Sequence, residues 1–293
     1  MNTLNTVAII SPGDMGHVVG HVLKENGLNV ITCLQNRSER TKALAASVGI
    51  TDVGTMEAVV EQADIVLSIL VPAQALSAAQ LAADAITATN ADVLYADCNA
   101  ISPATVQAMG HIIIEAGGRF VDASIIGPPP RNPGSTRIYA SGSHAEELAV
   151  LNNYGLTIPV LDDEIGQASA IKMCYAALTK GTTALCTELL TAAHALGVGE
   201  ALDAEFQQSQ AVMHKRMQGL PNMPAKSRRW VGEMEEIAKT FAEVGMTPKI
   251  LEGAADMYRF VGSTSLADRN PEDPTPLPST AEMVEALADT LSS

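Results

Sequence analysis

Two glycines that follow an apolar run are the first residues whose spacing suggests chemistry. The run TVAII (residues 6–10) passes directly into SPGDMG (residues 11–16), and an amphipathic segment then continues to Gly27. A dinucleotide-binding turn has the pattern G-x-G-x-x-G between a strand and a helix, and here Ser11 replaces the first glycine. Gly13 would let the backbone approach a pyrophosphate, and Gly16 would let the helix pack closely on the strand. The segment predicts a phosphate-binding turn, with an ordinary glycine-containing loop as the alternative.

The end of the second apolar run bears on the identity of the dinucleotide. Residues 29–34 are followed by Gln35, Asn36, Arg37 and Ser38, with Arg40 shortly after. An acidic residue at this place would bind the ribose 2′-hydroxyl of NAD, whereas an arginine suits the 2′-phosphate of NADP. The sequence therefore favours NADP over NAD. Ser38 is also a good helix N-cap, and the two roles are compatible.

These candidate sites need a sheet and helices to position them, and the first half of the chain alternates between the two patterns. Because its apolar runs are mostly continuous, the strands should be parallel and covered on both faces. The pattern predicts an α/β fold with a Rossmann-type, doubly wound parallel sheet. The expected strands are 6–10, 29–34, 64–70, 91–97, 118–124, 136–141 and 156–161, and the expected helices are 15–26, 38–48, 73–87, 102–116 and 144–153.

The character of the sequence changes after residue 162. Residues 165–197 contain no proline and are rich in Ala, Leu and Thr, which predicts one long helix. Further helices are expected over 200–217, 225–243 and 248–261, and a short amphipathic helix near the end. We therefore expect a dinucleotide-binding domain over residues 1–162 and an all-helical domain for substrate binding and dimerisation over 163–293, joined by the long helix. That helix is more apolar than one small domain can cover, so we also expect a symmetric homodimer.

Composition excludes several classes of function. The formal net charge of the 293-residue chain is −15, which argues against nucleic-acid binding. Its apolar runs are too short to span a membrane, and its start lacks the pattern of a signal peptide, so we expect a cytoplasmic protein. The cysteines are scattered and the histidines occur singly, which suggests neither a disulfide framework nor a metal site. We expect a small-molecule substrate.

Six segments, taken in order, resemble the β-hydroxyacid dehydrogenases, the superfamily that includes 6-phosphogluconate and 3-hydroxyisobutyrate dehydrogenases. SPGDMG resembles the family's G-L-G-x-M-G, NRS its N-R-[ST], and DIVLSILVP the segment that passes the cofactor ribose. DCNAISP resembles D-x-S-T-x-x-P, FVDASIIGPPP the substrate-binding F-x-D-A-P-V-S-G-G, and GQASAIKMCYAAL the interdomain-helix segment G-x-x-x-x-x-K-x-x-x-N. The second half is similar to a less characterised branch, through KMCYAALTKG and RRWVGEMEEIA.

The resemblance implies that Lys172 is the catalytic acid/base, in a cleft between the two domains. A lysine partly removed from water there could take the proton of a substrate hydroxyl, or return it during reduction. The substrate-binding residues that we expect are Asn99, Ser124, Ile126, Gly127, Pro128 and Tyr175, the last because its hydroxyl could stand in for the family's asparagine. The implied cofactor-binding residues are Ser11, Gly13, Asp14, Met15, Asn36, Arg37, Ser38, Leu70, Val71 and Asn99.

The departures from the family pattern concern the recognition of a substrate carboxylate. The asparagine four residues after the lysine is Ala176, and the serine of the substrate loop is Ile126. Asn99-Ala100 stand where the family has a serine-threonine pair, and Glu233-Met234 stand where it has a Lys-Asp pair in its last helices. Arg228 or Arg229 could supply another contact for an anion. We therefore expect hydride transfer to or from a small hydroxy or keto compound in a bulkier or less acidic pocket. An imine reductase and a non-catalytic NADPH sensor are the alternatives.

Overall fold

The computed structural model describes residues 4–270 and 275–291. By its internal contacts the chain divides into residues 1–173 and residues 174–293, here called the sheet unit and the helical unit. The domain boundary expected after residue 162 precedes this division. The difference arises at the start of α7 (Gln167–Ala195), where Ala168 and Ser169 bond to residues of the sheet unit.

The sheet unit contains one seven-stranded sheet in the order β3-β2-β1-β4-β5-β6-β7. Strands β1 to β6 are parallel, as expected, whereas β7 runs antiparallel to β6. The strand expected over 156–161 is wrong, because only Val160 of that segment forms an isolated bridge, with Ala140. The strands are β1 Thr6–Ile10, β2 Asn29–Thr32, β3 Thr51–Asp52, β4 Ile65–Ser68, β5 Leu94–Asp97, β6 Arg119–Ile126 and β7 Arg137–Ser141.

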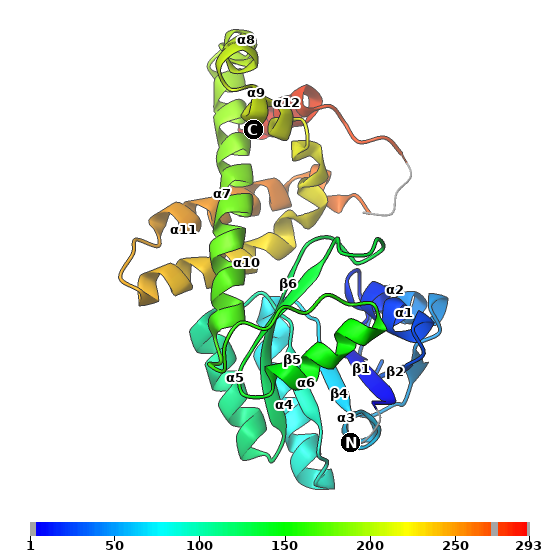
Figure 1. Cartoon of the computed structure of the whole chain (residues 1–293). Coiled ribbons are helices and arrows are strands. Elements are labelled where there is room, and N and C mark those ends of the chain that lie inside the picture. Colours follow the sequence, from blue (N-terminus) through cyan, green and yellow to red (C-terminus); the bar gives the residue numbers. More distant parts are fainter. Residues whose placement is uncertain (1–3, 271–274, 292–293) are drawn as a thin grey trace. The chain divides into compact units, whose positions relative to one another are not determined.

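Helices cover both faces of this sheet (Figure 1). Successive side chains of a strand point to opposite faces, so Val7 and Ile9 of β1 enter one hydrophobic core while Ala8 and Ile10 enter the other. The first core is closed by α1 (Gly16–Glu25), α2 (Glu39–Ser47) and α6 (Ala145–Ala149), and the second by α3 (Met56–Gln62), α4 (Pro72–Thr89) and α5 (Pro103–Glu115). The expected doubly wound arrangement is confirmed.

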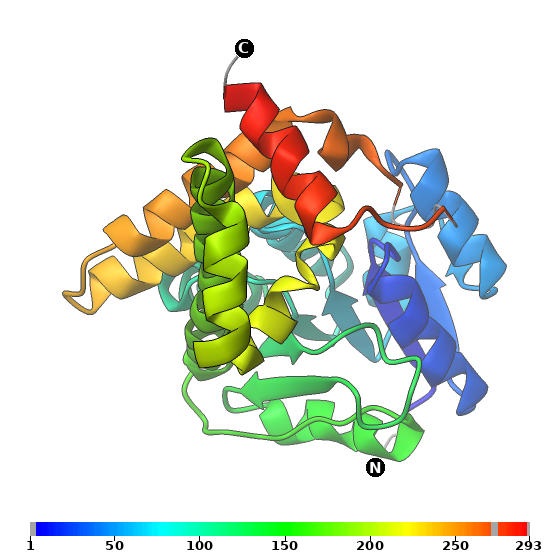
Figure 2. The same ribbon diagram turned by 90° about the horizontal axis from the view of Figure 1, so that it is seen from above.

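The helical unit contains the rest of α7 and, in its described residues, five further α-helices. In Figures 1 and 2, α10 and α11 lie side by side, and their buried faces carry residues such as Met234, Ile237, Leu251 and Tyr258. The single helix expected over 200–217 is wrong: Gln210 leaves helical geometry, with φ −134° and ψ 41°, and separates two helices. The helices after α7 are α8 Gly199–Ser209, α9 Ala211–Met217, α10 Pro224–Glu243, α11 Lys249–Ser263 and α12 Thr280–Leu291.

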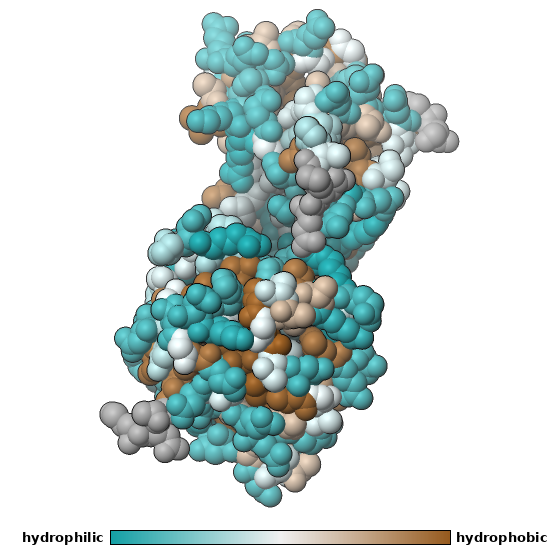
Figure 3. All heavy atoms as spheres, turned by 90° about the vertical axis from the view of Figure 1, so that its right-hand side faces the viewer, coloured by the Kyte–Doolittle hydropathy of each residue, from teal (hydrophilic) through white to brown (hydrophobic). Residues whose placement is uncertain are grey.

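The surface of the protein is mixed in hydropathy. On the face shown in Figure 3, hydrophilic residues predominate and hydrophobic patches interrupt them. Throughout the described ranges, each helix is either too short or too polar to cross a membrane.

Candidate functional site

The glycine turn keeps its shape although its first glycine is a serine. Ser11 adopts a left-handed backbone conformation with φ 62°, which glycine enters freely but which costs another residue about 1 kcal/mol. The amide of Gly13 donates to the carbonyl oxygen of Ser11 at 2.7 Å, closing the turn directly after β1. The substitution therefore does not abolish the tight turn that the fingerprint requires.

The two glycines that the turn keeps, Gly13 and Gly16, have different surroundings. A Cβ atom on Gly16 would lie 2.9 Å from the carbonyl oxygen of Ser11 and 3.0 Å from Ile9 Cγ2, so α1 can pack on β1 only with glycine there. A Cβ on Gly13 would meet only the Ser11 oxygen, at 4.0 Å. Gly13 thus leaves open space beside the start of α1, where Asp14 and Met15 precede a helix end that favours anions. These residues fit the phosphates of a dinucleotide.

The end of β2 and the start of α2 lie beside this turn. Arg40 forms an ion pair with Asp14, so the two segments expected to hold the cofactor are brought together. Arg37 donates to the amide oxygen of Gln74 at 3.4 Å, and burial lowers the pKa of its guanidinium. Ser38 caps α2 by accepting from the amide of Thr41 at 3.2 Å. Arg37 therefore carries a half-buried positive charge whose described side-chain partner is neutral.

The residue before Arg37 also has an unusual backbone. Asn36 has φ 59°, a left-handed value that asparagine tolerates better than most residues, and it turns the chain between β2 and α2. The turn explains how Arg37 and Arg40 follow so closely on the end of the strand.

Asn99 joins the carboxyl ends of β4 and β5. Its Oδ1 accepts from the amide of Leu70 at 2.5 Å, while its Nδ2 donates to Ser68 Oγ at 3.1 Å and to Asp97 Oδ1 at 2.5 Å. The side chain is buried, and the next residue after Leu70, Val71, is exposed. Asn99, Leu70 and Val71, all expected near the cofactor, thus follow the carboxyl ends of two neighbouring strands. Asn99 acts there through the backbone that it holds, since its own polar atoms are engaged.

The substrate loop expected after β6 combines buried and exposed residues. Ser124 is buried, and its hydroxyl has no hydrogen-bond partner among the described residues. Ile126 is buried as well, whereas Gly127 and Pro128 are exposed. Gly127 has φ 126°, and a Cβ there would lie 2.4 Å from the carbonyl oxygen of Ser135. Glycine is therefore required where the loop leaves the strand.

Lys172 reaches this strand from the first turns of α7. Its Nζ donates to the main-chain carbonyl oxygen of Ile125 at 2.6 Å, and the side chain is partly buried. The sheet unit thus brings the expected acid/base to the expected substrate segment. Tyr175 and Ala176 belong to the helical unit, where Tyr175 is exposed and Ala176 is buried.

Two groups of polar residues come together only in the folded chain. The first consists of Asp122, Ser141 and Ser169, which bond to one another where α7 begins. Asp122 lies inside β6, Ser141 ends β7 and Ser169 lies in the first turn of α7, so no local pattern links the three residues. The second lies in the helical unit, where Lys180 forms a buried ion pair with Glu233 and its Nζ lies 5.2 Å from the ring centre of Trp230. Two features of the sequence pointed to it: Lys180 competes with Lys172 as the candidate acid/base, and Glu233-Met234 replaces the family's Lys-Asp pair.

Two protein-family models match separate parts of the chain. Residues 6–153 match the NAD binding domain of 6-phosphogluconate dehydrogenase, and residues 193–261 match a domain of unknown function, DUF1932. The sheet unit is thus an NAD(P)-binding domain.

Solved structures extend the likeness to the whole chain. The conserved protein MTH1747, described as of unknown function and similar in structure to 3-hydroxyacid dehydrogenases, is 34% identical, with 88% of this chain and 100% of that chain covered and a TM-score of 0.65. Mycobacterium tuberculosis 3-hydroxyisobutyrate dehydrogenase with L-serine shares the fold at 17% identity, with coverage of 99% and 100% and a TM-score of 0.71. An imine reductase from Myxococcus stipitatus in complex with NADP⁺ shares it at 20% identity, with coverage of 87% and 92% and a TM-score of 0.55.

The match over half of the chain and the relative of 34% identity lead to the same conclusion. The chain belongs to the family that carries the NAD-binding domain of 6-phosphogluconate dehydrogenase, in a divergent branch whose helical half contains DUF1932.

Proposed function

We propose that this protein is an NADP-dependent oxidoreductase acting on a small hydroxy or keto compound, with Lys172 as its general acid/base. The observation that carries the proposal is the position of Lys172 Nζ, 2.6 Å from the carbonyl oxygen of Ile125 in the substrate strand. When bound, NADP supplies or accepts the hydride. The fold shared with Mycobacterium tuberculosis 3-hydroxyisobutyrate dehydrogenase supports the reaction class.

The hydrogen bond to Ile125 suits the lysine to proton transfer. It fixes the direction of Nζ beside the substrate strand, and an ammonium group can donate through three protons. During reduction Lys172 gives a proton to the carbonyl oxygen of the substrate, and during oxidation it takes the proton of the hydroxyl. A positioned acid/base of this kind contributes roughly 10²- to 10⁴-fold to a rate.

Arg37 is the residue that we assign to the 2′-phosphate of NADP. Its guanidinium is half-buried beside the neutral Gln74, so an incoming phosphate dianion would gain a charge-assisted bond. Gly13 and the start of α1 would hold the pyrophosphate, and Leu70 and Val71 would pass beside the ribose. This assignment favours NADP over NAD.

The substrate pocket should accept compounds less acidic than a simple hydroxy acid. Ile126 is buried where the family pattern has a carboxylate-binding serine, and Ala176 offers no amide group. Ser124 retains a buried hydroxyl whose hydrogen-bonding capacity is not used within the described chain. Ser124, Gly127 and Pro128 are the substrate contacts that we propose in this loop, and Asn99 supports the site by holding the backbone of Leu70.

The test is Lys172→Met, which keeps most of the length of the side chain and removes its ammonium group. Turnover of a panel of 2- and 3-hydroxy acids, ketones and aldehydes is measured with saturating NADP⁺ or NADPH, and cofactor affinity is measured separately by NADPH fluorescence. We expect kcat to fall by at least roughly 100-fold while NADPH affinity stays within a few-fold. A variant with near-normal kcat would refute the role of Lys172.

An imine reductase is the second candidate, because carboxylate-binding residues are missing and an NADP⁺-bound imine reductase has the same fold. Adding cyclic imines to the same panel separates the two: reduction of imines without turnover of any hydroxy or keto compound identifies it. Tight NADPH binding with no turnover of either class identifies the sensor instead.

We also propose that the protein is a cytoplasmic homodimer. Helix α7 carries large apolar side chains that are exposed, Leu178 by 67% and Leu185 by 59%, and Leu196 directly after the helix is exposed by 76%. All four cysteines are free thiols, which suits a reducing compartment. Sedimentation of the native chain should give a dimer, and Leu185→Glu should give monomers; a monomeric native chain would refute this proposal.

A further inference from the structure

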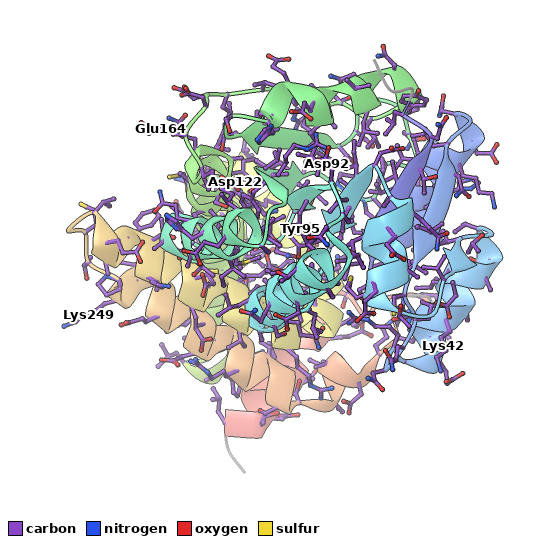
Figure 4. The ribbon with its side chains drawn as sticks, turned by 90° about the horizontal axis from the view of Figure 1, so that it is seen from below. Lys42, Asp92, Tyr95, Asp122, Glu164 and Lys249 are labelled. Carbon is purple, nitrogen blue, oxygen red and sulfur yellow. The ribbon has the colours of Figure 1, made fainter. Side chains whose placement is uncertain are left out.

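The carboxylate of Asp122 is the centre of a buried hydrogen-bond cluster at the start of α7. Its Oδ2 accepts from the amides of Gly166 at 2.9 Å and Ser169 at 3.0 Å, and from Ser141 Oγ at 3.1 Å. Its Oδ1 accepts from Ser169 Oγ at 2.7 Å. Ser141 Oγ in turn accepts from the amide of Ala168 at 3.0 Å. Figure 4 shows Asp122 in the interior of the sheet unit.

This cluster replaces an ordinary helix cap. The first amides of a helix lack partners within the helix, and a side chain just before the helix usually accepts from them. Here the acceptor for Gly166 and Ser169 comes from β6, more than forty residues earlier in the chain. An anionic acceptor is also favoured at the positive end of a helix. The start of α7 is therefore fastened directly to the sheet.

The same strand and the same helix make a second contact three residues further along each. Asp122 bonds to Ser169, and Ile125 bonds to Lys172 through its carbonyl oxygen. A shift of α7 by one residue would rotate it by about 100° and move it by about 1.5 Å, which would take Lys172 away from Ile125. The register set at Ser169 thus decides where Nζ lies.

Because the carboxylate of Asp122 is buried, losing one of its hydrogen-bond partners is costly. Burial raises the pKa of Asp122, and the bonds from Ser169, Ser141 and Gly166 oppose that rise. A buried polar group that loses its partner costs about 1–3 kcal/mol, and a charged one more. The cluster therefore permits one arrangement of α7 against β6 and penalises others.

We propose that Asp122 is a positioning residue for Lys172: by binding the first turn of α7 it sets the place and orientation of the catalytic ammonium. Ser169 is its principal partner, because it contributes both an amide and a hydroxyl. The inference rests on the proposed role of Lys172. It adds that the competence of this lysine depends on a carboxylate that does not touch the substrate.

The test uses Asp122→Asn and Ser169→Ala, with Ser169→Thr as the conservative variant that keeps the hydroxyl. Thr32→Val is the control, because it removes a buried hydroxyl that donates to Ile9 at 2.7 Å within the same unit, away from α7. All variants are compared by urea unfolding, by kcat and KM across pH, and by the titration of Lys172. The titration of Lys172 is followed by NMR after ¹³C reductive methylation of the lysines. The Lys172→Arg variant identifies which resonance belongs to Lys172.

We expect Asp122→Asn and Ser169→Ala to lower kcat roughly 10- to 100-fold with KM for NADPH unchanged, and to shift both the pH profile and the Lys172 titration. Ser169→Thr should restore both, and Thr32→Val should lose stability without either change. If Asp122→Asn does not fold, Ser169→Ala decides. Folded variants with native pH profile and native Lys172 titration would overturn the inference.

The titration also separates this inference from the proposed function. If Lys172→Met keeps its kcat, the catalytic role of Lys172 fails. The NMR titration of the Ser169→Ala protein still shows whether Asp122 and Ser169 set the environment of that lysine.

Discussion

Asp97 of β5 lies directly opposite Asp122 of β6 in the parallel sheet, and both carboxyl groups are completely buried. Burial raises the pKa of Asp97 to about 7, and the charge of Asp122 adds to the increase. The two residues have different partners: Asn99 bonds to Asp97, whereas the start of α7 bonds to Asp122. Asp97 is therefore the carboxyl group expected to keep its proton close to neutral pH.

This burial predicts that stability decreases as pH rises. The pKa of Asp97 is about 7 in the folded protein against an ordinary value of 3.8, so the folded state binds more protons between these values. The free energy of unfolding should then fall as pH rises from about 4 through 7, by at most about 4 kcal/mol from this group. Asp97→Asn, which resembles the protonated carboxyl, should remove most of that slope in urea unfolding at pH 5 to 8. Equal slopes for the two proteins would contradict this account.

The ion pair in the helical unit should matter more for stability than the other ion pairs on α10. Lys180 and Glu233 are nearly buried, and Arg229 Nε lies 3.7 Å from Glu233 Oε1. Glu233→Gln leaves the lysine without its charge partner and should cost about 3–5 kcal/mol. Glu235, on the same helix as Glu233, forms an exposed pair with Arg259 of α11 and is the control: Glu235→Gln should cost less than about 1 kcal/mol.

The double variant Lys180→Met with Glu233→Leu completes this comparison. Replacing a buried pair by apolar residues is often neutral, so the double variant should regain most of the stability lost by Glu233→Gln. Urea unfolding measures all three proteins. A double variant as unstable as Glu233→Gln would show that the loss comes from disturbed packing around Trp230 and not from an unpaired charge.

Alanine at the two glycines of the first turn should affect different properties: stability at Gly16 and cofactor binding at Gly13. Gly16→Ala places a Cβ 2.9 Å from a backbone oxygen and should destabilise the fold by about 1–3 kcal/mol. Gly13→Ala meets only one atom, at 4.0 Å, and should fold normally. It should nevertheless weaken NADPH binding at least several-fold, because its Cβ fills the space assigned to the pyrophosphate. Unfolding and NADPH titration of both variants check this, and normal NADPH affinity of Gly13→Ala would place the phosphates elsewhere.

The elements that follow from local pattern were predictable. The continuous apolar runs indicated β1, β2, β4, β5 and β6, and Ser38 indicated the start of α2, because these signals lie within a few residues of the structure that they specify. The short strand β3 and helix α3 were missed. The segment 156–161 has an apolar composition like a strand, but its backbone bonds mostly as a loop beside β7.

Parts of the candidate site depend on contacts between distant segments, which no local pattern encodes. The resemblance singled out Lys172, but nothing near it showed that Ile125 would supply its acceptor, 47 residues earlier. Asp122 and Ser169 are likewise 47 residues apart, and each is unremarkable alone. The pairing of Arg40 with Asp14 also needs the fold, because it joins two motifs that the sequence presents separately.

The preference between NADP and NAD is tested most directly at Arg37. Arg37→Met removes the half-buried charge assigned to the 2′-phosphate, and a charge-assisted bond is worth about 1.5–3 kcal/mol. NADPH affinity should therefore fall roughly 10- to 150-fold, while NADH, which lacks that phosphate, should bind as before. Lys42→Met is the matched control: it removes the same charge from an exposed position on α2, at the outer edge of the sheet unit in Figure 4, where Lys42 pairs with Glu39. Calorimetric titration of the three proteins with both cofactors gives the comparison. If NADH affinity falls as much as NADPH affinity, Arg37 supports the turn as a whole, and the basis for choosing NADP is lost.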